Sequence, residues 1–278
     1  MRKSAAPLLL VLAILAGCSP HFHLDFLGEE KMAEVVLVPG PAEAKVLMID
    51  VDGVISTEID TGLFSREKNA VSRVYERLER AARDPRIKAV VLRLDTPGGE
   101  ITASDMIYHE VLKFKERTKK PVVGLMMGIA ASGGYYIASA CDHIIAHPTT
   151  LTGSIGVISI FPDFGDLMAK IGIKVNVIKS AEAKDSGSPF RDMTAEEKKL
   201  FQAIIDEYYQ DFLNVVAANR GERITPDELR TIADGRVYTA PQALRLKLID
   251  AVGYFDDAFA KTLSLAGLKS ARLVGYTY

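Results

Sequence analysis

Two glycine-containing turns hold the residues best suited to chemistry. Residues 95–99 read DTPGG and residues 128–134 read GIAASGG, and each turn follows an apolar run that predicts a strand. In an open α/β fold both turns would lie at the carboxyl edge of the sheet, where such folds place their sites. Ser132 precedes a predicted helix, whose first N–H groups lack intrahelical partners and can stabilise an oxyanion. The pattern fits a serine nucleophile, although a serine that only caps the helix fits the same turn.

A nucleophilic serine needs a base to take its proton. Of the five histidines, His147 leaves a Ser-His-Asp triad open, but no acid near it stands on an element that would orient it. The alternative is a Ser-Lys pair, in which burial keeps the lysine neutral. Lys179 and Lys184 are candidates by position, because they follow a predicted strand in a stretch of Ala, Ser and Gly that could form a loop over the site.

The elements that would position these residues alternate between strand and helix. Strands are predicted at 45–51, 89–94, 121–127, 143–146, 155–160 and 174–178, and helices at 66–83, 103–115, 131–140 and 164–171. Alternation at this spacing indicates parallel strands with right-handed crossovers in an α/β fold. A long helix over 194–219 opens with a capping box of Thr194 and Glu197, and Thr225 followed by Pro226 starts another.

The first residues predict export. Arg2 and Lys3 precede an apolar run over 5–17, which has the length of a signal-peptide core and is too short for a membrane-spanning helix. The run ends at Cys18 in a sequence that resembles the bacterial lipobox, so Cys18 is the expected lipidation site. We therefore expect a signal peptide at 1–17, a proline-marked tether at 18–44 and one domain at 45–278.

Composition narrows the class of protein. The 278 residues are 48% hydrophobic and 25% charged, which excludes a disordered chain and a polytopic membrane protein. A net charge of −2 gives no basic field for nucleic acid. Two cysteines far apart in the sequence do not indicate a disulfide scaffold.

Three separated motifs together resemble one enzyme family. They are GIAASGGYYIA around Ser132, LTGSIGVI around Ser154 and AKDSGSPFRDMT from Ala183, and the DTPGG turn and DGRVYTAPQA from Asp234 also match. This combination resembles the signal peptide peptidase A (SppA) group of serine peptidases, over about residues 45–259. The resemblance implies a ClpP/crotonase-like α/β fold, with a repeated β-β-α/βαβ spiral core and C-terminal helices. Ala240 and Lys247 depart from it, because the family usually has glycine at both positions.

The resemblance also implies roles for individual residues. Ser132 would be the nucleophile, Lys184 the general base and Ser154 the residue that orients the lysine, while the amides of Gly99 and Gly133 would form the oxyanion hole. No metal or cofactor is implied. The implied substrates are remnant signal peptides or other short, unfolded apolar peptides.

Assembly and location are implied in the same way. Single-length members of the group form rings or domes in which serine and lysine come from adjacent copies. We therefore expect a homo-oligomer that is held by its lipid anchor on the exported side of a membrane of the bacterial cell envelope.

Two other readings stay open at this point. Asp50 and Asp52 in IDVDGV look like the first motif of haloacid-dehalogenase-type phosphatases, which use Mg²⁺. The chain could also be a lipid-anchored scaffold that keeps the fold without catalysis.

Overall fold

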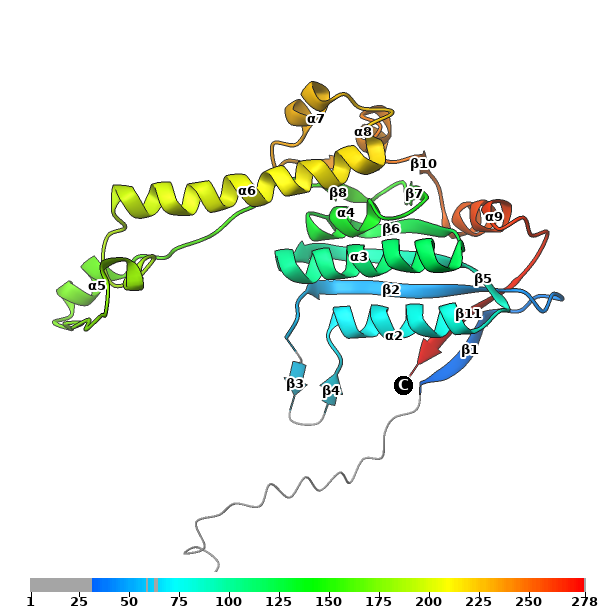
Figure 1. Cartoon of the computed structure of the whole chain (residues 1–278), viewed down its shortest axis with the longest axis horizontal. Coiled ribbons are helices and arrows are strands. Elements are labelled where there is room, and N and C mark those ends of the chain that lie inside the picture. Colours follow the sequence, from blue (N-terminus) through cyan, green and yellow to red (C-terminus); the bar gives the residue numbers. More distant parts are fainter. Residues whose placement is uncertain (1–31, 59, 63–64, 278) are drawn as a thin grey trace, which may run out of the picture. The chain divides into compact units, whose positions relative to one another are not determined.

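The computed structural model describes residues 32–58, 60–62 and 65–277 (Figure 1). Residues Glu34–Tyr276 form one compact unit. Cys18, the predicted signal peptide and the first part of the predicted tether lie outside the described residues. Where the structure describes the chain, no helix is both long enough and apolar enough to cross a membrane.

A mostly parallel sheet forms the centre of the unit. Among the described residues its main path is β1 (Ala33–Val38), β11 (Arg272–Thr277), β2 (Lys45–Ile55), β5 (Ile87–Gly99), β6 (Val122–Ala131), β7 (His143–Ala146) and β10 (Ala251–Val252). From β11 to β10, neighbouring strands on this path run parallel. The short strand β8 (Leu151–Gly153) pairs in parallel with the end of β6 and antiparallel with β9 (Val237–Thr239). The predicted α/β class is confirmed.

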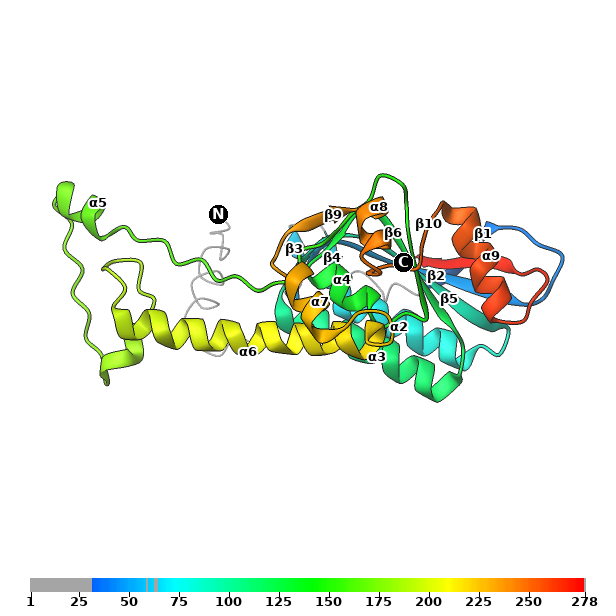
Figure 2. The same ribbon diagram turned by 90° about the horizontal axis from the view of Figure 1, so that it is seen from above.

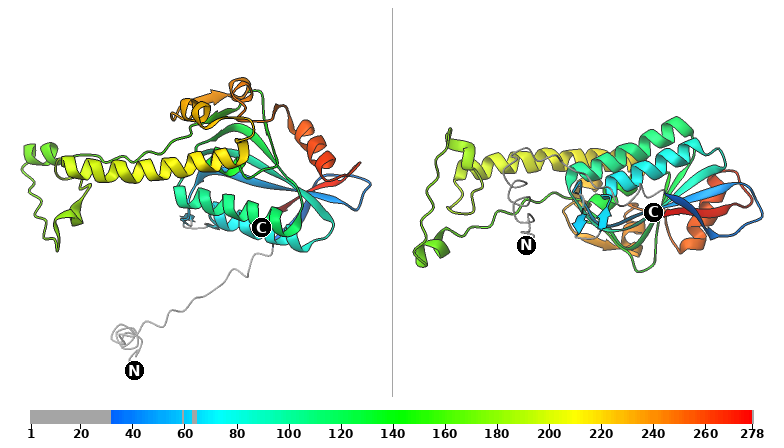
Figure 3. Two further views of the ribbon diagram at one scale, coloured as in Figure 1. Left: turned by 45° about the horizontal axis from the view of Figure 1, so that its top comes forward. Right: turned by 90° about the horizontal axis from the view of Figure 1, so that it is seen from below.

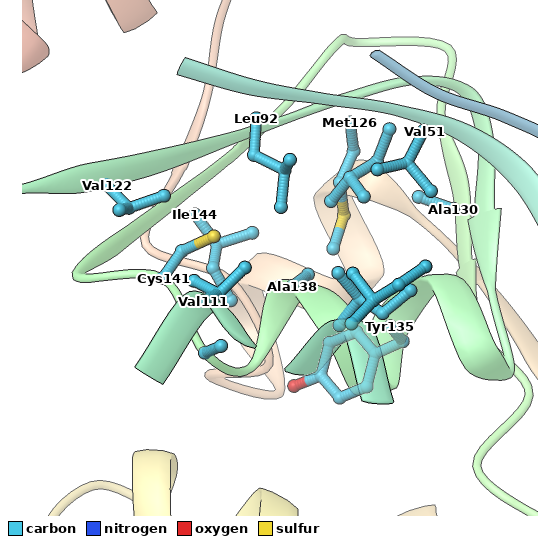
Figure 4. Packing of buried hydrophobic residues seen from close by; sticks show 14 of the residues in the cluster. Val51, Leu92, Val111, Val122, Met126, Ala130, Tyr135, Ala138, Cys141 and Ile144 are labelled. Atoms are coloured by element: carbon cyan, nitrogen blue, oxygen red, sulfur yellow. The ribbon is translucent and has the colours of Figure 1, made fainter. Parts of the chain in front are cut away.

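Helices cover both faces of the sheet, which explains the continuous apolar runs in its strands. Leu47, Ile49 and Val51 of β2 point to the face covered by α2 (Ala70–Arg83), α3 (Ile101–Thr118) and α4 (Gly133–Ala138). Val46 points to the other face, where α9 (Phe255–Leu265) packs. Figure 3 shows the cyan α2 and the orange-red α9 on opposite sides of the sheet. In the larger core, Leu92 and Met126 point toward α4, from which Tyr135 and Ala138 project (Figure 4).

The C-terminal part is helical, as predicted. It contains α6 (Ala195–Arg220), α7 (Pro226–Ile232) and α8 (Ala240–Arg245). The capping box of Thr194 and Glu197 is confirmed, and Pro226 stands in the first turn of α7. Only the second half of α6 packs on the core, through side chains such as Phe212 and Val216, and its first half runs beyond the sheet (Figure 2).

The segment between β8 and α6 differs most from the prediction. It contains the predicted helix as α5 (Gly165–Lys170) and a short 3-10 helix, η1 (Glu182–Asp185). The strands predicted at 155–160 and 174–178 are wrong, because neither segment pairs with a strand in the described part of the chain. Alternating apolar residues favour an extended backbone, but a strand also needs a neighbour with which to exchange hydrogen bonds. We call residues 155–194 the arm.

The predicted tether also contains structure. Strand β1 lies within it at the edge of the sheet beside β11. Glu34 of β1 accepts a hydrogen bond of 2.6 Å from Lys45 Nζ at the start of β2. The prolines at 39 and 41 suggested a free chain, whereas the apolar run before them pairs as an edge strand. The described part of this segment is therefore tied to the domain.

A small hairpin, β3 (Asp60–Gly62) and β4 (Ser65–Glu67), lies outside the main sheet. It occupies the region where the helix over 66–83 was predicted to begin. That helix starts instead at Ala70, because the Asn69 side chain accepts a hydrogen bond of 2.8 Å from Ser72 N and caps it.

Candidate active site

Ser132 occupies the turn from β6 into α4. Its φ of 52° and ψ of −121° lie outside the regions that L-residues ordinarily adopt. The turn is held in place because Ser132 N donates a hydrogen bond of 2.9 Å to Gly153 O in β8. The Ser132 side chain makes no capping hydrogen bond to α4. This removes the interpretation of Ser132 as a simple helix cap, and it leaves the hydroxyl group available.

Glycines surround this serine because no side chain would fit. Gly98 has a φ of 102°, and a Cβ atom added there would lie 2.7 Å from Gly133 N and 2.8 Å from Ser132 Cβ. A Cβ atom on Gly133 would lie 2.2 Å from Ser104 Oγ. The DTPGG turn and the serine turn therefore touch through bare backbone, as their shared sheet edge predicted.

Gly98 was not predicted to belong to the site, whereas its neighbour Gly99 was. Gly99 pairs with Ile55 in the β2–β5 ladder, and an added Cβ atom there would meet Ile55 O at 2.0 Å. Gly98 is the glycine whose missing side chain leaves room beside Ser132. The pair of adjacent glycines in the DTPGG turn was a signal for Gly98, because glycine is the residue that adopts a positive φ at no steric cost.

The Gly133 amide could receive an oxyanion in this turn. Gly133 N is the first helical N–H of α4, and no acceptor for it is found among the described residues. The Ser132 amide is occupied by Gly153 O. A carbonyl oxygen next to Ser132 could therefore take its hydrogen bond from Gly133.

Ser154 lies beside the serine turn. Ala131 and Gly153 are register partners in the β6–β8 pair, so Ser132 and Ser154 each come directly after paired residues. Ser154 has a φ of 51°, and its amide donates a hydrogen bond of 2.8 Å to Arg236 O. The structure thus brings Ser132, Ser154, Gly98 and Gly133 together.

Lys184 lies elsewhere in the same chain. It is exposed in η1, and its neighbour Asp185 is tied through Arg191 to Glu197 in the first turn of α6. The helix α4 meets α6 at Phe212, where the ring centroids of Tyr136 and Phe212 are 5.0 Å apart. From residue 197 to residue 212 an α-helix rises roughly 22 Å. Within one chain, Ser132 and Lys184 are not brought together.

The other candidate bases have partners of their own. Lys179 Nζ donates hydrogen bonds to Asp185 and Glu182, and the bond to Asp185 is the main cause of its raised pKa. A raised pKa keeps Lys179 charged and makes it a poor base. His147 Nδ1 lies 2.8 Å from Thr149 Oγ1, and no contact with Ser132 is found among the described residues.

The phosphatase motif is not supported by its geometry. Asp50 pairs with Arg93 at 2.6 Å and Asp52 pairs with Arg73 at 2.6 Å. Both carboxylates lie inside β2, which continues to Ile55, and not at the end of a strand. A carboxylate near the C-terminus, Asp257, accepts the Tyr254 amide hydrogen bond and caps α9. These carboxylates have structural roles.

Comparisons with known proteins agree with this geometry. Residues 114–269 match the family model for peptidase family S49, and residues 61–151, which include Ser132, match the model for Clp protease. A Methanocaldococcus jannaschii protein assigned as a protease is 35% identical over 254 residues, covering 91% of this chain and 76% of its own.

Two further relatives carry more specific names. An Enterococcus faecium protein assigned as signal peptide peptidase SppA is 34% identical over 251 residues, covering 90% of this chain and 72% of its own. The chloroplastic serine protease SPPA of Arabidopsis thaliana is 36% identical over 188 residues, covering 67% of this chain and 27% of its own. With a ClpP-like α/β fold and a free serine at the start of α4, this chain belongs to peptidase family S49, as a serine peptidase of the signal peptide peptidase type.

Proposed function

We propose that this chain is an endopeptidase that cleaves short, unfolded apolar peptides, among them remnant signal peptides, with Ser132 as nucleophile and Lys184 as base. The observation that carries the proposal is the strained backbone of Ser132, whose hydroxyl caps nothing. Such strain persists only where the surroundings enforce it, and it gathers at functional sites. Here Gly153 O and the bare backbone of Gly98 enforce it.

The proposed reaction runs through an acyl-enzyme. Neutral Lys184 takes the Ser132 proton while Ser132 Oγ attacks the peptide carbonyl, and the Gly133 and Gly99 amides receive the oxyanion. Lys184 then returns the proton to the leaving amine as the C–N bond breaks. A water molecule, deprotonated by the same lysine, hydrolyses the ester and releases Ser132. Ser154 orients the lysine amine.

In this proposal each active site is completed by a neighbouring copy of the chain. The rise of roughly 22 Å along α6 between the Lys184 and Ser132 attachment points is far beyond the reach of a lysine side chain. The arm also exposes large apolar residues such as Ile158 (79%), Ile160 (80%) and Ile178 (100%). Several large apolar side chains exposed on one segment are typical of an interface. A ring of copies would cover the arms and bring each lysine to the next serine.

The proposal includes a membrane anchor at Cys18 on the exported side of the cell envelope. Acyl chains on a cysteine hold a soluble domain at a membrane surface, which is where remnant signal peptides arise. A Cys18→Ser chain should shift from the membrane fraction to the soluble fraction of cells. Unchanged membrane attachment of this variant would contradict the anchor.

Subunit mixing tests the shared site. Ser132→Ala and Lys184→Ala should each lower peptide cleavage to a small residual rate while leaving the fold intact by circular dichroism. Mixing the two inactive variants and allowing subunits to exchange should restore part of the activity, because some interfaces then join an intact serine to an intact lysine. Full activity of Lys184→Ala alone would overturn the lysine assignment. Full activity of wild-type monomers in analytical ultracentrifugation at assay concentration would overturn the shared site.

A further inference from the structure

Arg191 makes many hydrogen bonds where the arm joins the start of α6. Its Nε donates to Asp185 Oδ2 at 3.1 Å, and its Nη2 donates to Asp185 Oδ1 at 3.0 Å. Nη2 also donates to the backbone carbonyl of Asp185 at 3.1 Å. Arg191 therefore fixes both the side chain and the backbone of the residue that follows Lys184.

The same guanidinium group binds a second carboxylate on α6. Its Nη2 and Nη1 donate to the two carboxylate oxygens of Glu197 at 2.6 and 3.0 Å. Glu197 in turn accepts the Thr194 amide at 2.8 Å and closes the capping box of α6. One planar side chain thus links η1, which carries Lys184, to the first turn of a 26-residue helix.

The two carboxylates that Arg191 binds are largely shielded from solvent. The side chains of Asp185 and Glu197 are 13% and 10% exposed. The hydrogen bond from Arg191 is the main cause that lowers the pKa of Asp185, and it lowers the pKa of Glu197 to about 2. Both carboxylates stay charged at neutral pH, and the bidentate geometry gives the link a fixed direction.

Further contacts, made mainly by Phe161, also hold the part of the arm around Lys184. Phe161 packs against Phe201 of α6, with ring centroids 4.3 Å apart and ring planes tilted by 35°. Phe164 N donates to Pro189 O at 2.7 Å. A Cβ atom on Gly187 would lie 2.9 Å from the Phe161 ring. The loop around Lys184 is therefore tied to α6 on two sides, by the Arg191 hydrogen bonds and by the Phe161–Phe201 contact.

We propose that Arg191 is a positioning residue for Lys184, and that it holds η1 at a fixed place on α6 so that each arm presents the lysine to the neighbouring serine in one geometry. This inference rests on the proposed role of Lys184 as base. The contacts of the arm support this inference. Lys184 Nζ has no hydrogen-bond partner among the described residues, whereas the next residue, Asp185, accepts several hydrogen bonds from Arg191.

Kinetics of Arg191 variants test the inference. Arg191→Ala should lower kcat about 100-fold, because a misplacement of about 1 Å costs on this order. KM should stay within about twofold, because the peptide binds at the sheet edge and not at the arm. Arg191→Lys should remain slow, since an ammonium group keeps the charge but cannot span both carboxylates. Wild-type kcat in either variant would overturn the inference.

The matched control is Arg117→Ala. It removes an arginine that pairs with Glu79 on the helical face of the domain, away from the arm. This variant should keep wild-type kcat and KM. Sedimentation of each variant at assay concentration must show the wild-type assembly, and a loss of kcat that appears only with dissociated subunits would count against positioning.

The double variant separates this inference from the proposed function. If Arg191 acts through Lys184, then Arg191→Ala should cause no further loss in a Lys184→Ala background. An additional 100-fold loss there would overturn the positioning role while leaving the dyad intact. Wild-type activity of Lys184→Ala alone would instead overturn the dyad.

Discussion

Two serines in left-handed backbone conformations mark the site before any side chain is considered. Ser132 and Ser154 have φ values of 52° and 51°, and they follow the paired ends of β6 and β8. Each such residue costs roughly 1–3 kcal/mol. Each amide is held by a carbonyl from a different part of the chain, Gly153 for one and Arg236 for the other. The surrounding fold therefore maintains the strain at both serines.

Gly98 should be needed for peptide cleavage, as Ser132 beside it is. We expect Gly98→Ala to lower kcat/KM at least 100-fold, because the new methyl group would push the Gly133 amide and Ser132 Cβ apart. The control is Gly267→Ala, which also has a positive φ, of 66°, but has no atoms within 4 Å of the added Cβ. It should lose stability in urea denaturation while keeping its activity. Equal kcat/KM for both variants would contradict the proposed role of Gly98.

Lys247, which lies outside the candidate active site, allows a test of backbone strain. This lysine stands where the resembled family usually has glycine, and its φ is 62°. We expect Lys247→Gly to stabilise the fold by roughly 0.5–1 kcal/mol, because the side-chain clash disappears while some chain entropy is lost. Lys269→Gly, at an exposed lysine without positive φ, should give no gain. Urea denaturation measures both variants, and destabilisation by Lys247→Gly would contradict the prediction.

At the scale of elements, local signals were enough for most helices and strands but not for their pairing. Capping residues such as Thr194 act within one turn, so α6 was predicted within a residue of its ends. The strands β5 and β6 run past the apolar stretches into the glycine turns. Sequence shows where the apolar residues stop, whereas the neighbouring strands β2 and β8 determine where pairing stops.

The site was predictable to the same extent. Ser132 could be proposed from the sequence because its residue type and its turn are adjacent there. Gly98 and the left-handed Ser154 depend on contacts between distant segments, so spacing alone did not identify them. Spacing left Lys179 and Lys184 both open, and the family resemblance singled out Lys184. In the folded arm Lys179 donates a hydrogen bond to Asp185, which the sequence did not indicate.

A buried ion pair joins the inner end of α6 to the sheet. Arg220 and Asp250 are 4% and 6% exposed and form two hydrogen bonds of 2.8 and 3.1 Å. Asp250 also accepts the Ile144 amide in β7 at 2.7 Å. Burial alone would raise the pKa of Asp250, but Arg220 outweighs it and lowers that pKa to about 2. The pair thus fixes α6 where it passes α4.

The free energy of unfolding should depend on the Arg220–Asp250 pair and should fall at acid pH. Asp250→Asn leaves Arg220 buried without a counter-charge, so we expect a loss of about 3–5 kcal/mol in the free energy of unfolding. Because the folded pKa lies below the unfolded value of about 3.9, ionised Asp250 stabilises the fold above that pH. This stabilisation is lost as pH falls from about 4 to about 2. Urea denaturation at several pH values should show a smaller acid-induced loss in Asp250→Asn than in the wild type, and equal losses would refute the assignment.

At the scale of the whole molecule, the arm is the part that one chain leaves incomplete. Its junction with α6 is held by Arg191, Glu197 and the Phe161–Phe201 contact, while its predicted strands have no neighbouring strand in the part of the chain that the structure describes. The arm is thus held by specific contacts at one end and exposes alternating apolar residues along its length. Such a segment is suited to pairing with another chain. The same feature accounts for the two wrong strands and for the separation of Ser132 from Lys184.

Charges on this apolar surface should therefore remove assembly and activity together. We expect the double substitution Ile158→Asp and Ile160→Asp to give monomers in sedimentation and to lower specific activity at least tenfold, because two carboxylates cannot be desolvated in an apolar interface. Raising the protein concentration should recover part of the activity by mass action. Leu265→Asp, on an exposed position of α9, is the control and should keep both assembly and activity. A double variant that is monomeric and fully active would show that the exposed apolar residues of the arm serve some purpose other than completing the active site.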